Sequence, residues 1–312
     1  MKRSVLKLIA FSVLPLLVIS YAVYITGKKT DDFYKRFISP QQNSLILGSS
    51  RAASMNPEII NRIIHPIYSG ANLYNYAFTT VHSPYGPKYL ESIKKKVKPD
   101  TKNGVFIVTV EPTAVMVDKN KPDSSEYYVE NDRSVAQTSQ VAINPNIEYL
   151  LESYNFSITN ELNKKILRPK NAIAEISVLD NGKVNCVILK RNSFQKQQEI
   201  NRKKMIDFEK RLLSLKHSDN RIQYLEKTID FLKSHGTVIM VRVPINKIPY
   251  FLENKSWPDF DSRMKDTALK TNVQYINYNN LPNHYQWTDE VHMELDSMDD
   301  FSAVLARDII KK

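Results

Sequence analysis

The sequence predicts an α/β protein, a three-layer sandwich with a mainly parallel central sheet, and two observations carry that prediction. Short apolar runs typical of buried strands alternate with amphipathic stretches typical of helices. That order produces parallel strands joined by helices. Hydrophobic residues make up 42% of the 312 residues and aromatic residues 10%, which is enough to build a core. The strand candidates are residues 44–48, 72–78, 104–110, 237–243 and 273–278.

Helical patterns separate the first three strand candidates. Residues 44–48 form an apolar run that ends in Gly48, and a helical pattern with paired isoleucines begins directly after it. The helix expected between the second and third strands covers residues 85–97 and has a basic face. This order makes the first half of the sheet parallel.

The same rhythm returns toward the C-terminus. Helices are expected over residues 221–235, 259–270 and 296–311. Gly236 is placed as the C-terminal cap of the first of these helices. The last two strand candidates lie between the three helices, so they extend the same parallel sheet.

The middle of the chain departs from this rhythm. Residues from about 113–205 are polar and irregular, and we interpret them as an insertion into the domain. A helix is expected within it over residues 147–167. A hairpin is expected from strands at 175–179 and 183–189, because an Asn-Gly dipeptide between two β-rich runs is a strong hairpin signal.

The N-terminal residues carry a candidate membrane segment. Residues 8–26 are uncharged, and a helix needs roughly 20 apolar residues to span a bilayer. This predicts a single-pass protein of the cytoplasmic membrane whose domain lies outside the cytoplasm. The alternatives are a signal peptide cleaved near Ser20 and Ala22, and a buried N-terminal helix of a cytoplasmic protein. The predicted division is an anchor at 1–27, a linker at 28–43 and a domain at 44–312.

Composition excludes several kinds of site. The single cysteine, Cys186, excludes a disulfide framework, a Cys-rich zinc site and an iron–sulfur cluster. The seven glycines are too widely spaced for a glycine-rich phosphate loop, which excludes nucleotide binding by such a loop. No cofactor is expected. A net charge of +11 suggests an anionic neighbour, such as lipid headgroups or an acidic polymer. Export and the lack of a binding motif argue against nucleic acid.

Two stretches are candidates for catalysis. Ser50 follows the first strand, at the sheet edge where open α/β folds bind ligands, and its hydroxyl is a candidate nucleophile. Asp289 and His292 lie three residues apart before the last helix, so the carboxylate can orient the imidazole. The alternatives are a helix-capping serine, a surface histidine, and a metal site that would add His284 and Glu294. No known ligand spacing supports the metal site.

With these residues the sequence resembles the SGNH (GDSL-like) hydrolase superfamily. The family's first block, a strand followed by Gly-Asp-Ser, is similar to Gly48-Ser49-Ser50. Its last block, Asp-x-x-His, matches Asp289 and His292. The resemblance implies a flavodoxin-like sandwich in which Ser50 is the nucleophile, His292 its base, and Asp289 the residue that orients the base.

The resemblance also implies where an oxyanion would be held. The family's second block is similar to Asn75-Tyr76-Ala77, so the backbone N–H groups of Ser50 and Ala77 are the expected donors. The Asn75 side chain is a candidate for a further donor, because the family's third block, Gly-x-Asn-Asp, is missing. Ser49 also replaces the family's aspartate, and Ala77 replaces its glycine.

A narrower resemblance bears on function. Membrane-anchored SGNH-like proteins with a Gly-Ser-Ser first block include those that transfer D-alanine to teichoic acids or acetylate alginate-type polysaccharides, working with a multi-spanning O-acyltransferase. This implies an extracytoplasmic serine esterase or O-acyltransferase acting on envelope polysaccharide or a similar polymer. The alternative is a degenerate domain that only binds a polysaccharide or such a partner. Arg51 and Arg242 are candidates for binding an anionic group, with a structural ion pair as the alternative.

Overall fold

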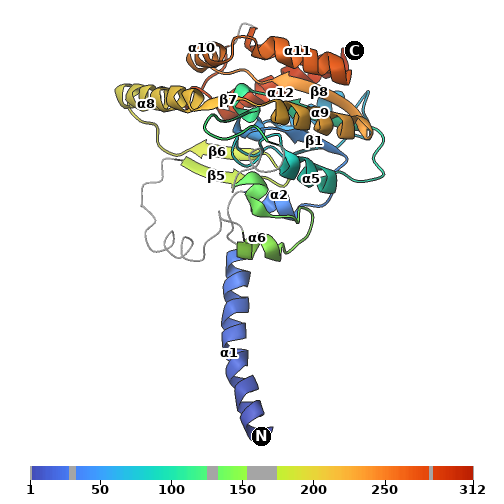
Figure 1. Ribbon diagram of the computed structural model, residues 1–312, viewed down its shortest axis with the longest axis vertical. Helices are drawn as coiled ribbons and strands as arrows, with labels where there is room; N and C mark the ends of the chain where they lie inside the picture. Colours follow the sequence, from blue (N-terminus) through green and yellow to red (C-terminus); the bar gives the residue numbers. More distant parts are fainter. Residues whose placement is uncertain (1, 28–32, 125–132, 153–173, 281–283, 312) are drawn as a thin grey trace.

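The computed structural model describes residues 2–27, 33–124, 133–152, 174–280 and 284–311. These residues form an α/β fold around a five-stranded parallel sheet (Figure 1). The strands are ordered β2-β1-β3-β8-β9, the order of flavodoxin-like doubly wound sheets. They are β1 (Ser44–Leu47), β2 (Leu73–Asn75), β3 (Gly104–Thr109), β8 (Gly236–Arg242) and β9 (Gln274–Asn277). The predicted fold class, with its mainly parallel sheet, is confirmed.

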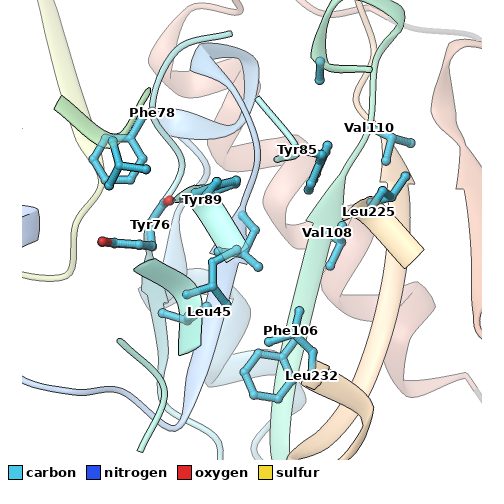
Figure 2. Close-up of a cluster of buried hydrophobic side chains, with 14 of the residues drawn as sticks. Leu45, Tyr76, Phe78, Tyr85, Tyr89, Phe106, Val108, Val110, Leu225 and Leu232 are labelled. Carbon is cyan, nitrogen blue, oxygen red and sulfur yellow. Dashed lines mark hydrogen bonds between the residues drawn. The ribbon is translucent and has the colours of Figure 1, made fainter. Parts of the chain in front are cut away.

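Helices cover both faces of the sheet, because strands of a parallel sheet are apolar on both faces. In β3, Phe106 and Val108 belong to one core, whereas Val105 and Ile107 belong to the other. Figure 2 shows part of the first core, where Phe106 lies beside Leu232. The helices over the first core are α5 (Pro87–Lys96), α9 (Asp219–Lys233) and α11 (Phe260–Thr271). Those over the second core are α4 (Pro57–Ile64) and α12 (Leu295–Ile310).

Two glycines lie where neighbouring strands approach closely. Gly48 follows β1 with a φ of 137°, and a Cβ there would overlap Oγ1 of Thr109 on β3. Only glycine therefore fits at the turn that leads out of β1. Gly236 is the first residue of β8 and not the cap of α9, so the predicted cap was wrong. A Cβ on Gly236 would overlap the Gly104 carbonyl, so strand packing requires this glycine.

The helices that follow β1 and β8 differ from the prediction. The helix expected after β1 is split into α3 (Ser50–Ala53) and α4. The split occurs because Asn56 caps a new helix start, accepting the backbone N–H groups of two residues of α4. A helix that was not predicted, α10 (Lys247–Ser256), follows β8. Pro249 argues against a helix, but it lies in the first turn, where proline is tolerated.

The middle segment lies outside the central sheet. Its predicted hairpin is confirmed as β5 (Ala174–Val178) paired antiparallel with β6 (Val184–Ile188). Of the helix expected over 147–167, the structure shows α6 at its start, and the part from 153 on lies outside the described residues. The pairing of β4 with β7 was not predicted. The remaining elements are α2 (Tyr34–Ile38), η1 (Pro112–Ala114), β4 (Met116–Asp118), η2 (Ser134–Gln137), α6 (Ile147–Glu152), α8 (Phe194–Leu213), β7 (Leu215–His217) and η3 (Tyr278–Asn280).

The first helix, α1 (Lys2–Gly27), extends away from the body of the protein (Figure 1). The β5–β6 hairpin, α2 and α6 lie at the end of the body from which α1 emerges. Large apolar side chains along α1 are exposed, including Leu8, Phe11 and Leu14. Within the described residues, no helix combines the length and the apolarity needed to cross a membrane.

Candidate active site

The predicted nucleophile lies at the carboxyl edge of the sheet. Ser50 is the first residue of α3, directly beyond β1 and the Gly48 turn. Ser49 fixes this junction, since its hydroxyl accepts the Arg51 backbone N–H and donates to Glu111 Oε2 at 2.8 Å. The chain thus turns at a fixed point, with Ser50 placed at the strand order's switch point between β1 and β3.

The second half of the site comes from the loop before α12. His292 Nε2 lies 2.9 Å from Ser50 Oγ, and His292 Nδ1 lies 2.8 Å from Asp289 Oδ1. The same Asp289 oxygen accepts the backbone N–H of His292, which closes the loop over the three residues. Serine, imidazole and carboxylate are therefore linked in the order that nucleophilic catalysis requires.

The electrostatics of Asp289 favour its charged form. Burial raises the pKa of this carboxyl, but the hydrogen bond and charge of His292 and the nearby Lys204 outweigh it and leave the pKa below its ordinary range. Lys204 Nζ on α8 lies 3.0 Å from Asp289 Oδ2. A charged Asp289 favours the Nδ1–H tautomer of His292, which leaves Nε2 free to accept a proton from serine.

A strained residue shapes the Asp-x-x-His loop. Glu290 has a φ of 73°, in the left-handed region that a bulky residue rarely adopts. Its side chain accepts hydrogen bonds from Asn201 of α8 and from Asn246, and its carbonyl accepts the Asn246 backbone N–H. Sequence reasoning missed this role, since these partners lie 89 and 44 positions away and no local pattern marks them.

The two predicted oxyanion residues, Ala77 and Asn75, form hydrogen bonds with each other and with the neighbouring helix α3. The Ala77 backbone N–H donates to Asn75 Oδ1 at 3.1 Å. The Asn75 amide donates to three carbonyls at the end of α3, those of Ala52, Ala53 and Met55. Both residues are fully buried, so Asn75 is a structural cap for α3 here and not a donor toward Ser50. Among the described residues, the Ser50 backbone N–H has no acceptor.

The two predicted substrate-binding arginines lie in a buried ion network. Arg51 Nε is 3.3 Å from Glu111 Oε2, and one Arg51 terminal nitrogen is 2.6 Å from Glu253 Oε1. Arg242 lies 2.9 Å from both Glu253 and Asp261. Burial lowers the Arg51 pKa, but Glu111 and Glu253 outweigh it and keep the guanidinium charged. The structure thus favours the structural ion-pair alternative for both arginines.

A pocket of about 370 Å³ opens beside the catalytic candidates, and Ser50, Asp289 and His292 contribute to its lining. Much of the remaining lining is apolar. Phe78 comes from the chain beyond β2, and Ile176 and Val184 come from the β5–β6 hairpin. The sequence predicted this hairpin as part of an insertion, and no role in the site was predicted for it.

The described residues do not suggest a metal centre. Across them, no group of three or more histidine, cysteine, aspartate or glutamate side chains is placed to hold an ion. Glu294, part of the metal alternative, instead pairs with Arg191 at 3.0 Å.

In comparisons with known proteins, no family model and no curated protein matches the chain.

Proposed function

We propose that this chain is a serine esterase or O-acyltransferase of the SGNH type. The single observation that carries the proposal is the linked geometry of Ser50, His292 and Asp289, with 2.9 Å and 2.8 Å between successive polar atoms. A helix-capping serine does not need an imidazole at this distance, and here Ser49 acts as the cap. The position at the carboxyl edge of a parallel sheet is where such folds bind ligands.

The proposed reaction uses only these groups and a co-substrate hydroxyl. His292 Nε2 takes the proton of Ser50 as Oγ attacks the carbonyl carbon of an ester. The bond from Oγ to the acyl carbon forms, the ester C–O bond breaks, and the leaving oxygen takes the proton from His292. Water or a polymer hydroxyl then attacks the acyl-serine and gives its proton to His292, which returns it to Ser50. The Ser50 backbone N–H is a donor for the oxyanion.

The proposal includes attachment to a membrane through α1, with the catalytic domain outside the cytoplasm. Apolar residues lie on all sides of this helix, and Leu8, Phe11 and Leu14 are 71%, 79% and 68% exposed. A helix that is apolar all round needs an apolar surrounding, and the described part of the chain does not supply one to these three residues. The +11 net charge suits a neighbouring anionic lipid or envelope polysaccharide. A multi-spanning O-acyltransferase is the partner we propose.

The test is activity-based labelling of the full chain, reconstituted in phospholipid nanodiscs. A fluorophosphonate probe reacts with activated serines, and peptide mass spectrometry identifies the labelled position. We expect an adduct on Ser50, which Ser50→Ala removes and His292→Ala slows by roughly 10²- to 10⁴-fold. Ser234→Ala, an exposed serine at the end of α9, is the matched control and should label like the parent chain. An unlabelled Ser50 in folded protein contradicts the proposal.

A second candidate function is binding without catalysis. The observation that favours it is that two of the three predicted oxyanion donors, the Ala77 N–H and the Asn75 amide, already donate to groups within the fold. Loss of one such donor costs roughly 10²- to 10³-fold in turnover. A folded chain without a Ser50 adduct that still binds envelope polysaccharide would favour this function over the first.

A further inference from the structure

The wall of the pocket opposite the body of the domain is built by the β5–β6 hairpin. Ile176 pairs with Cys186 across the hairpin, and both residues line the pocket together with Val184. Side chains alternate between the two faces of a strand, so these three residues share one face. Ser177 and Asn185, which pair with each other, lie on the opposite face. The hairpin therefore presents an apolar face to the candidate active site and a more polar face away from it.

The opposite wall is apolar as well. Phe78, Met293 and Leu295 line the pocket from the body of the domain, next to His292. Ile176 remains 52% exposed, so part of the hairpin's apolar face is uncovered in this structure. Burying apolar surface of this kind is favourable, and an apolar ligand between the two walls would cover it.

The entry of the chain into the domain also lies at this pocket. Phe33 contributes to the lining, and it follows Gly27, the last residue of α1, by six positions. A chain spans at most about 3.6 Å per residue, so Phe33 lies within about 22 Å of the end of α1. If α1 is held in a membrane, the pocket opens close to the surface where acyl chains are anchored.

We propose that the pocket holds the acyl chain of the ester substrate, and that this chain is of medium length and longer than acetyl. This inference rests on the proposed function. A volume of about 370 Å³ corresponds to roughly a dozen water-sized groups, which fits an unbranched chain of about six to ten carbons. Acetyl would leave most of the apolar lining uncovered. The acyl group is transferred to Ser50 and then to water or a hydroxyl by the steps given under the proposed function.

The first arm of the test measures chain-length preference. The full chain in nanodiscs is assayed with p-nitrophenyl esters whose acyl chains have two to twelve carbons. We expect kcat/KM to rise about three- to fourfold per methylene up to about eight carbons. Val184→Phe fills the pocket and should lower the ratio of octanoate to acetate turnover at least tenfold. Val187→Phe, on the opposite face of the same strand, is the matched control and should keep the parent ratio. A flat dependence on chain length overturns the inference.

The second arm separates this inference from the proposed function. Cys186 is the only cysteine of the chain and lines the pocket, so its reaction with a thiol reagent reports occupancy without catalysis. In Ser50→Ala protein, ethyl octanoate should slow Cys186 modification at least fivefold, whereas ethyl acetate should not. Protection without turnover in the parent chain supports the acyl pocket and contradicts the esterase. Turnover without protection or length preference supports the esterase and overturns the acyl pocket.

Discussion

Glu253 is the residue whose replacement tests the buried ion network most directly. Its carboxylate is fully buried on α10 and bridges two guanidinium groups, lying 2.6 Å from Arg51 and 2.9 Å from Arg242. Glu253→Gln keeps the shape but removes the charge that compensates both arginines. Breaking a buried ion pair from one side typically costs 3–5 kcal/mol, because a buried charge loses its partner. Arg51 keeps Glu111 and Arg242 keeps Asp261, so we expect the lower end, about 3 kcal/mol.

Urea denaturation measures this loss. The buried Trp257 directly follows α10 and stacks on His217, so its fluorescence reports unfolding of this region. The matched control is Glu209→Gln, which removes an exposed ion pair with Lys255 at 3.2 Å. Surface pairs contribute about 0–1 kcal/mol, so this control should leave the midpoint nearly unchanged. A loss below about 1 kcal/mol for Glu253→Gln, equal to the control, would refute the argument that the network depends on this charge.

Three further predictions concern stability and catalysis. Burial lowers the pKa of Lys96 to about 7, so between pH 7.5 and 9 the unfolded chain binds more protons. The free energy of unfolding should then rise with pH by up to about 1.4 kcal/mol per pH unit. Urea denaturation at several pH values measures this pH dependence, and the same dependence in Lys96→Met would contradict its assignment to Lys96. Gly48→Ala should prevent folding, because its Cβ would overlap Thr109, and circular dichroism should show no folded soluble protein. Gly70→Ala, which has open space around it, should fold like the parent chain. Asp289→Asn should lower ester turnover by roughly 10⁴-fold, and retention of a tenth of the activity would contradict its orienting role.

Much of the fold follows from local pattern. The runs around Ile46, Ile107 and Met240 are apolar on both faces, and such runs separated by helices imply a parallel sheet. The Asn181-Gly182 turn located the hairpin for a similarly local reason. Where helix boundaries were wrong, a single capping residue such as Asn56 outweighed the longer periodicity.

The candidate site could be predicted only in part. Ser50, Asp289 and His292 carry motifs that are readable in sequence, and the structure brings them within hydrogen-bond distance. The partners of Asn75 and Arg51 could not be read in this way. Asn75 was expected to face an oxyanion, but it caps a helix of four residues whose end no sequence pattern marked. Pairings between distant charges depend on which helices pack together, and that information is not local.

Helix α10, which the sequence did not predict, connects both halves of the site. At the start of α10, Asn246 donates to the Glu290 side chain and backbone, and so holds the strained turn between Asp289 and His292. Within α10, Glu253 forms an ion pair with Arg51, the residue that follows Ser50. A displacement of α10 would therefore move the base and the nucleophile together. Positions held from one rigid element keep their separation, which is what a proton transfer over 2.9 Å requires.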